Sequence, residues 1–269
     1  MRLIKEILIY IIDIMDYRVA VCSYQRSKGL GEKTLKTLEK YNIPKNKIDI
    51  FVANKKEEKI YRHLYGGGYN IIRGVIGMRQ IREFMFNYYD DGDKILFMDD
   101  DITDIKELID SKTKLKDIDD LDKTIIKGFE LCEENNTILW GIYPCDNKGF
   151  MKHKHSTHLA FCVGWMWGCI IDKECLKQDP RMIGNFEDYE RSINVFKKYE
   201  KVIRLNNICA KTKYNQEDSG GMNIGDRLSG QKEDLEILKE ICGDYLIIKK
   251  KKCPLGQNPQ IKSNISKKL

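Results

Sequence analysis

Short apolar runs of strand length alternate with longer stretches of helical periodicity along most of this chain. The first two runs are Arg18–Ser23 and Asp49–Ala53, and between them Leu35 and Leu38 recur at helical spacing within Glu32–Tyr41. Such alternation is typical of a layered α/β fold. Because no repeat and no clear linker interrupts the pattern, we expect a single domain.

The rest of the chain continues this alternation. We expect strands over 69–72, 94–98, 137–142, 201–209 and 245–248, and helices over 74–89, 121–134, 185–198 and 233–241. Segment 159–171 is the most apolar part of the chain but is too short for a membrane helix, so we expect a buried hairpin or the floor of a pocket. Residues 211–225 are expected to form a Gly-rich loop.

Composition restricts the class of protein. With 269 residues, of which 42% are hydrophobic and 33% charged, the chain can bury a substantial core. Its nine cysteines are scattered singly without a Cys-x-x-Cys pair, which argues against a disulfide framework and a zinc cage. We therefore expect a protein of a reducing compartment, which means a cytoplasmic one. The apolar stretch 7–15 is too short to span a bilayer, so we interpret residues 1–17 as an N-terminal extension.

The net charge of +6 is unevenly distributed. Residues 249–269 contain seven lysines and no acid, which leaves 40 basic and 41 acidic residues in the remainder of the chain. We expect this segment to be a basic, disordered tail. A cationic tail attracts polyanions such as DNA through counterion release, although an inert soluble end is the alternative.

Residues 94–101 (KILFMDDD) form an apolar run that ends in Asp99, Asp100 and Asp101. Such a run fits a buried strand, and open α/β sheets bind ligands at the carboxyl ends of their strands. Three adjacent carboxylates repel one another, so at the edge of a sheet they are best explained by a cation bound between them. Hard divalent ions that hold substrate phosphates are bound in this way, by one or two carboxylates together with the phosphates. The alternative is a solvated acidic turn. We disfavour it because residues 102–104 resemble a helix start, which would hold the acids on a short loop.

A second acidic pair, Glu187 and Asp188, opens the helix expected over 185–198. Transfer of a group to a hydroxyl needs a carboxylate that removes the proton, and we assign this role to Asp188. The alternative is that the pair only complements the positive end of the helix dipole.

Five segments together form a set of recognisable motifs: Val19–Arg26 (VAVCSYQR), Ile50–Ala53 followed by Glu57, Gly74–Arg82 (GVIGMRQIR), Ile95–Ile102 (ILFMDDDI) and Phe186–Glu190 (FEDYE). With these motifs, residues 18–225 resemble a nucleotide-sugar glycosyltransferase of the GT-A type. The similarity is closest to the TET-associated glycosyltransferases of phages and their relatives, which modify hydroxymethylated DNA bases. The resemblance implies a Rossmann-like, mixed and mostly parallel sheet flanked by helices, in one domain over 18–248.

The resemblance also implies roles in donor binding. Asp99 and Asp101 match the outer acids of the Asp-x-Asp motif, which bind Mn²⁺ or Mg²⁺, and Asp100 lies between them at the sugar diphosphate. The other positions that match donor contacts are Ser23, Tyr24, Arg26 and Arg79. The donor implied is a nucleotide-diphosphate sugar, in the first place a UDP-sugar.

For the transfer itself, the resemblance implies that Asp188, in the Glu187-Asp188 motif, is the base of an inverting reaction. The implied acceptor is 5-hydroxymethylpyrimidine in phage DNA, such as hydroxymethylcytosine. One departure is that no histidine follows His158, whereas many GT-A enzymes use a late histidine as a metal ligand. The alternatives are transfer to a protein or surface glycan, a non-catalytic nucleic-acid-binding relative, and a nucleotidyltransferase.

Histidines and tryptophans give weaker signals. His153, His155 and His158 have the spacing of metal ligands, but a mobile loop that contacts an acceptor or a diphosphate is the preferred interpretation. Trp165 and Trp167 are expected to pack in the interior rather than to stack on a sugar or a base.

Overall fold

The computed structural model describes residues 16–110, 114–213 and 227–262. The strands of this part of the chain are β1 (Arg18–Ser23), β2 (Ile48–Val52), β3 (Asn70–Arg73), β4 (Lys94–Asp99), β5 (Ile102–Asp110), β6 (Lys114–Asp117), β7 (Leu139–Tyr143), β8 (Met166–Ile170), β9 (Ile203–Thr212), β10 (Leu246–Lys250) and β11 (Gln257–Ile261). The first nine form one sheet in the order β3-β2-β1-β4-β8-β7-β9-β5-β6, and β10 pairs with β11. In the large sheet, β5 and β8 run against the other seven strands.

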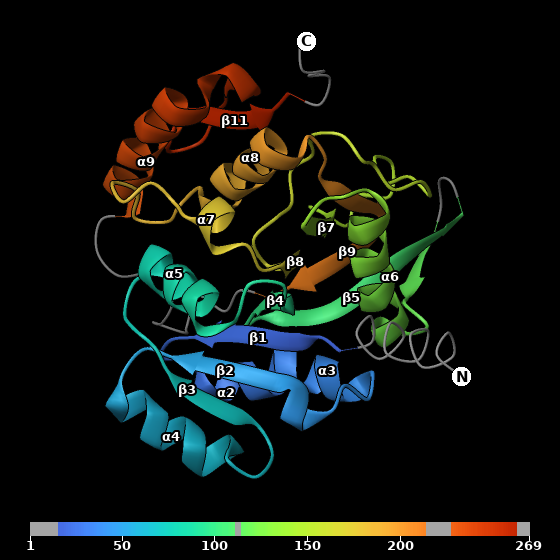
Figure 1. The fold of residues 1–269 in the computed structure, drawn as a ribbon, viewed down its shortest axis with the longest axis vertical. Coiled ribbons are helices and arrows are strands. Elements are labelled where there is room, and N and C mark those ends of the chain that lie inside the picture. The colour runs from blue at the N-terminus through green and yellow to red at the C-terminus, as the bar shows by residue number, and fades with distance from the viewer. Residues whose placement is uncertain (1–15, 111–113, 214–226, 263–269) are drawn as a thin grey trace, which may run out of the picture.

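Helices cover both faces of this sheet (Figure 1). The longer helices of the described residues are α4 (Lys55–Tyr65), α5 (Met78–Tyr88), α6 (Leu121–Glu134), α8 (Glu187–Tyr199) and α9 (Arg227–Cys242). The short helical elements are α2 (Ser27–Leu30), the π turn η1 (Gly31–Leu35), α3 (Lys36–Lys40), η2 (Lys45–Lys47), α7 (Lys173–Leu176) and η3 (Gly243–Tyr245). The predicted α/β class, with a mixed and mostly parallel sheet flanked by helices, is confirmed.

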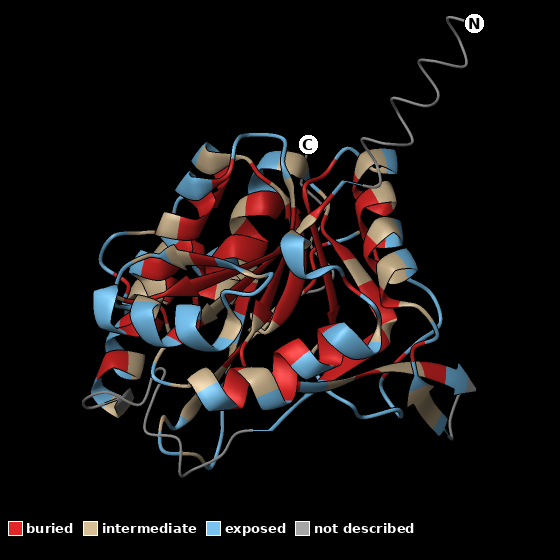
Figure 2. Cartoon of the chain, turned by 90° about the horizontal axis from the view of Figure 1, so that it is seen from below, coloured by how far each residue is buried: buried red, intermediate tan, exposed pale blue. Residues whose placement is uncertain are grey.

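The sheet separates two hydrophobic cores, because alternate side chains of a strand face opposite sides. Val21 and Leu96 belong to the core that includes residues of α2 to α4 and α6, whereas Ala20 and Phe97 belong to the core with α5, α8 and α9. Figure 2 shows the buried residues concentrated in the sheet and on the inner sides of the helices. Burial on both faces explains why β4 is a continuous apolar run rather than an alternating one.

Most predicted elements are present with shifted ends, but the helix start at residues 102–104 and the hairpin alternative for segment 159–171 are wrong. Residues 102–104 begin strand β5 instead of a helix, because pairing with β9 places Ile102 opposite Thr212 and Ile105 opposite Ala210. Segment 159–171 is largely buried but is not a hairpin, since its strand β8 inserts between β4 and β7. In addition, the helix predicted from residue 74 begins only at Met78, after Gly77 with a φ of 106°.

The basic segment 249–269, predicted to be a disordered tail, is ordered over much of its length. β10 continues to Lys250 and pairs along its length with β11, and the Tyr189 hydroxyl donates to the Pro259 carbonyl oxygen at 2.9 Å. Residues 1–15 of the predicted extension and 214–225 of the predicted loop lie outside the described residues. Among the helices that are described, none is both long and apolar enough to cross a bilayer.

Candidate functional site

The three consecutive aspartates lie where the parallel strands β1, β2 and β4 end. Asp99 is the last residue of β4 and pairs with Cys22 of β1, and Ser23 is the last residue of β1. On the other side of β4, the strand β8 starts at Met166, opposite Met98. The sequence therefore predicted correctly that the acids follow a buried strand at the carboxyl edge of the sheet.

Asp100 is the buried member of the triplet, and its carboxylate is fully engaged. Its Oδ2 accepts a hydrogen bond from Ser23 Oγ at 2.6 Å, and its Oδ1 pairs with Arg26 Nη1 at 3.2 Å. Ser23 Oγ also lies 2.8 Å from the hydroxyl of Tyr61 on α4. Asp100 thus holds the turn after β1 in place, and Ser23 and Arg26 both contact the triplet.

Asp99 and Asp101 have different surroundings. Asp99 Oδ1 accepts from Arg82 Nη2 at 2.9 Å. In the part of the chain that the structure describes, the Asp101 side chain forms no hydrogen bond or ion pair with another residue. Asp101 is therefore the acid of the triplet that is left for a ligand.

Burial and mutual repulsion disfavour the charged forms of the triplet. Burial, opposed by Arg82 and reinforced by the charge of Asp101, raises the pKa of Asp99 to about 6. The pKa of Asp101 is raised by burial and by Asp100. A cation at this point would relieve the repulsion, and carboxylate oxygens are donors that hard divalent ions accept.

The π turn η1 also holds the backbone of the triplet in place. Thr34 Oγ1 donates to the Asp99 carbonyl oxygen at 2.7 Å and accepts from the Ile102 amide at 3.0 Å, so one hydroxyl spans both ends of the triplet. Lys33 in the same turn is buried, and its charge acts on Asp101. Neither residue was foreseen, because helical periodicity does not reveal a π turn, which is often found at functional sites.

Two residues that are predicted to contact the donor, Tyr24 and Arg79, do not contact the triplet. Tyr24 is half-buried, and its hydroxyl accepts from Gln25 Nε2 at 3.2 Å. Arg79 pairs with Glu83 of its own helix at 2.8 Å. It is Arg82, one turn further along α5, that contacts the triplet.

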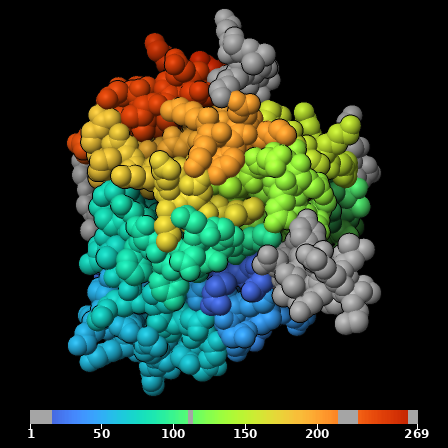
Figure 3. Space-filling view, viewed as in Figure 1, coloured from blue at the N-terminus to red at the C-terminus, as the bar shows by residue number. Residues whose placement is uncertain are grey.

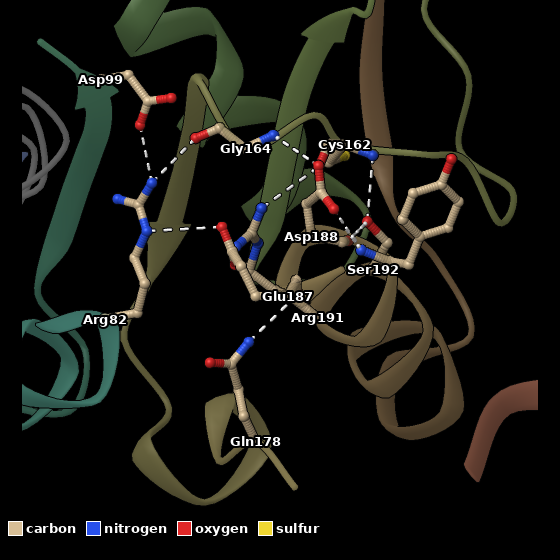
Figure 4. A network of polar contacts seen from close by, with 10 residues as sticks. Arg82, Asp99, Cys162, Gly164, Gln178, Glu187, Asp188, Arg191 and Ser192 are labelled. Atoms are coloured by element: carbon tan, nitrogen blue, oxygen red, sulfur yellow. Dashed lines mark hydrogen bonds and ion pairs between the residues drawn. The ribbon is translucent and has the colours of Figure 1, made fainter. Parts of the chain in front are cut away.

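Arg82 joins the triplet to the second acidic pair (Figure 4). It is almost completely buried, and its Nη2 also donates to the Gly164 carbonyl oxygen at 3.4 Å, while its Nε faces Glu187 Oε1 at 3.5 Å. Glu187 is paired with Arg191 as well, so two arginines hold its carboxylate. Such a carboxylate is suited to positioning its neighbours more than to accepting a proton.

The buried arginine Arg191 packs on an equally buried aromatic pair. Its guanidinium lies 3.6 Å from the centre of the Trp167 ring, and that ring stacks on Phe97 at 4.2 Å between centroids. Trp167 therefore packs in the interior, as predicted, whereas Trp165 is half-buried. The stacking fixes Arg191, and through it Glu187.

Asp188 is half-buried at the start of α8. Its Oδ2 accepts from the Gly164 amide at 3.2 Å and its Oδ1 accepts from the Tyr189 amide at 3.0 Å. Burial and the neighbouring Glu187 raise its pKa well above the ordinary value. Gly164 thus links both acidic sites, since its carbonyl contacts Arg82 and its amide contacts Asp188. A Cβ there would lie 3.1 Å from Glu187 Oε1, so a side chain would disturb the link.

A carboxylate from α9 fastens the loop that leads into α8. Asp234 is buried, and it accepts from the amides of Ile183 at 2.8 Å, Gly184 at 3.1 Å and Asn185 at 2.8 Å. The Asn185 side chain adds a fourth bond at 3.0 Å. In the sequence Asp234 resembles any charged residue of a surface helix, so no local signal identifies it.

No zinc site is formed by the three histidines. His153, His155 and His158 are exposed, and nowhere in the described segments do three His, Cys, Asp or Glu side chains come together as metal ligands. The triplet offers two carboxylates, Asp99 and Asp101. This set fits a hard divalent cation whose remaining ligands are phosphate and water.

No protein-family model matches the chain, and neither does any curated protein. Among solved structures it is similar to the mannosyltransferase PcManGT from Pyrobaculum calidifontis in complex with GDP-Man and Mn²⁺, at 10% identity and a TM-score of 0.48. This alignment spans 76% of our chain and 60% of the mannosyltransferase, less than two thirds of its length.

Two other solved structures are similar to the chain at a lower level. The galactosyltransferase LgtC, in complex with donor and acceptor sugar analogs, has 12% identity and a TM-score of 0.34, over 68% of our chain and 65% of LgtC. The 4-diphosphocytidyl-2C-methyl-D-erythritol synthase from Anaerococcus prevotii has 11% identity and a TM-score of 0.39, over 76% and 93%. At these identities we argue function from the site.

Proposed function

We propose that this protein is a metal-dependent glycosyltransferase that moves a sugar from a nucleotide-diphosphate sugar to a hydroxyl group. One observation carries the proposal. At the carboxyl edge of the sheet, Asp100 and Asp99 are held by Ser23, Arg26 and Arg82, while Asp101 has no partner among the described residues. Two aspartates held in place beside a third that has no partner are suited to bind a ligand together with its divalent cation.

The donor would bind across the ends of β1 and β4. Asp99 and Asp101 would hold Mn²⁺ or Mg²⁺, and Ser23, Tyr24 and Arg26 would contact a nucleotide such as UDP. When bound, the cation neutralises the diphosphate and acts as a Lewis acid that favours its departure. The buried Lys33 supplies a further positive charge beside Asp101.

Asp188 is the proposed general base. The acceptor oxygen attacks the anomeric carbon, its proton passes to the Asp188 carboxylate, and the bond between the anomeric carbon and the diphosphate oxygen breaks. A raised pKa suits this role, because a base works best when its pKa lies near the working pH. One positioned base without a dedicated nucleophile favours inversion at the anomeric carbon.

For the acceptor we propose the hydroxyl of 5-hydroxymethylpyrimidine in DNA. The proposal is supported by the motif resemblance and by the seven lysines of residues 249–269, which favour a polyanionic partner.

The test is a panel of nucleotide sugars with Mn²⁺, scored by release of nucleoside diphosphate, with and without duplex DNA that contains hydroxymethylcytosine. Mass spectrometry of the digested nucleosides should show a gain of one sugar on the modified base. Release without any gain on DNA would exclude the DNA acceptor, and absence of release with every donor would exclude the transferase.

The variant Asp101→Asn is the matched test of the cation site. It should abolish turnover and weaken Mn²⁺-dependent donor binding, because it removes the uncommitted carboxylate while leaving the Asp99 and Asp100 contacts intact. Full activity of this variant would contradict the proposed metal ligands.

A further inference from the structure

The loop after β7 gathers positive side chains around an exposed aromatic ring. Its basic residues are Lys148, Lys152, His153, Lys154, His155 and His158, against one acid, Asp146. Phe150, in the middle of the loop, is 66% exposed, which is the largest value among the exposed large apolar side chains of the described residues. In Figures 1 and 3 this yellow-green part of the chain stands out at the upper right.

The exposure of Phe150 is built into the loop. The Phe150 amide donates to the Asn147 carbonyl oxygen at 3.0 Å, which closes a tight turn. The next residue, Met151, is buried, and the Lys152 amide donates to the Asn206 carbonyl oxygen of β9 at 3.0 Å. The backbone is therefore anchored on both sides of a ring that remains in solvent.

Positive charge continues from this loop toward the acidic triplet. Asp146 faces Lys211 of β9 at 3.8 Å, and the exposed Lys213 follows at the end of that strand. The Lys213 amide donates to the Asp101 carbonyl oxygen at 3.1 Å, so the backbone at this end of β9 lies beside the candidate site. Burial lowers the pKa of His158, and the positive charges of Arg204 and Lys152 lower it further, so His158 has two cationic neighbours beside the loop.

We propose that the loop 146–155 is a nucleic-acid-binding surface, on which a base stacks on Phe150 and the strand's phosphates contact Lys152 and Lys154. Proteins that bind extended strands combine a cationic track with exposed aromatic rings in this manner. An acidic protein partner would use the lysines but would not require the ring. The inference rests on the DNA acceptor proposed above and identifies where that acceptor is held.

The test measures binding of a fluorescent hydroxymethylcytosine oligonucleotide, single-stranded and duplex, as a function of salt. Phe150→Ala should weaken binding by about 5- to 150-fold, the range for loss of one base–aromatic stack. Changing Lys152 and Lys154 to Gln should reduce the slope of log K against log salt by about 1.4 to 1.8. The control replaces two exposed lysines of α4, Lys55 and Lys59, with Gln and should leave both quantities unchanged.

Wild-type affinity of Phe150→Ala would overturn the inference, and so would an equal change of slope in the α4 control. If only the lysine variant lost affinity for the oligonucleotide, the contact would be purely electrostatic and the proposed base stack on Phe150 would be wrong. Release of nucleoside diphosphate from the donor alone is measured in parallel. Donor turnover without DNA binding would refute this surface but keep the transferase, whereas loop-dependent DNA binding without turnover would refute the transferase alone.

Discussion

The three aspartates after β4 are chemically identical, yet their surroundings give them different tasks. Asp100 holds the turn after β1, Asp99 is tied to Arg82, and Asp101 remains available. A single substitution in the triplet should therefore reveal which task has been removed. At the residue scale, position in the hydrogen-bond network decides function more than residue type.

Replacing Asp188 with Asn should spare donor binding but reduce transfer by roughly 10²- to 10⁴-fold, the usual scale for loss of a general base. The amide keeps the size of the side chain but cannot accept the proton. Single-turnover transfer and donor affinity, measured on the same preparation, separate the two effects. Loss of donor affinity together with rate would show that Asp188 is a structural cap of α8.

The pH dependence of transfer should reflect the same residue. Burial and Glu187 raise the pKa of Asp188 above the ordinary value for aspartate of about 3.9. The base must be ionised to act, so kcat should fall as the pH decreases through this raised pKa and should be constant above it. A profile of kcat against pH, recorded with saturating donor, gives the pKa at which activity is lost. A loss of activity only at the ordinary carboxylate pKa would contradict the assignment.

At the scale of elements, the site depends on contacts between segments that are far apart in sequence. The loop before α8 is shaped by Asp234 of α9, and the triplet is shaped by Thr34 of η1. Helices α8 and α9 themselves were predicted from periodicity. The contacts between them were not, because a charged residue on a helix gives no sign of its partner 50 residues away.

Replacing Asp234 with Asn should lower the free energy of unfolding by about 1.5–3 kcal/mol, the scale of hydrogen bonds to a charged group. The amide group turns a donor toward backbone amides that already donate, so the loop 183–185 loosens. We expect kcat to fall more than the donor KM rises, because the loop precedes Asp188. Urea unfolding and steady-state kinetics measure the two effects.

The matched control for this variant is Glu233→Gln, which removes the neighbouring but exposed charge. It should leave stability and kinetics unchanged. Equal effects of both variants would show that the net charge of α9 matters, and not the bonds of Asp234.

At the scale of the whole molecule, the C-terminal strands belong to the fold. Leu246 is buried in the core with α8 and α9, and β11 is joined to α8 by the bond between Tyr189 and Pro259. The sequence suggested a disordered end because a run of four lysines dominates its composition. The hairpin forms nonetheless, since Leu246 and Ile248 of its first strand have partners in that core.

Truncation after Tyr245 should therefore lower Tm by about 3–12 °C, because burial of one leucine contributes about 1.5–3 kcal/mol and each kcal/mol shifts Tm by about 2–4 °C. Replacement of the four lysines at positions 249–252 with Gln should leave Tm unchanged, because these side chains are largely exposed. Thermal unfolding of the truncated variant and of the lysine variant measures both effects. An unchanged Tm after truncation would mean that the hairpin adds no stability.

What the sequence determined by itself was local. Apolar periodicity placed the strands and helices, and the apolar run of β4 placed the acids at the edge of a sheet, because both features depend on neighbouring residues. Only the tertiary structure decided which side chains surround those acids. Arg82 rather than Arg79 reaches Asp99, and Ser23 reaches Asp100 across 77 residues. Such partners are selected by strand order and helix packing, which no local pattern encodes.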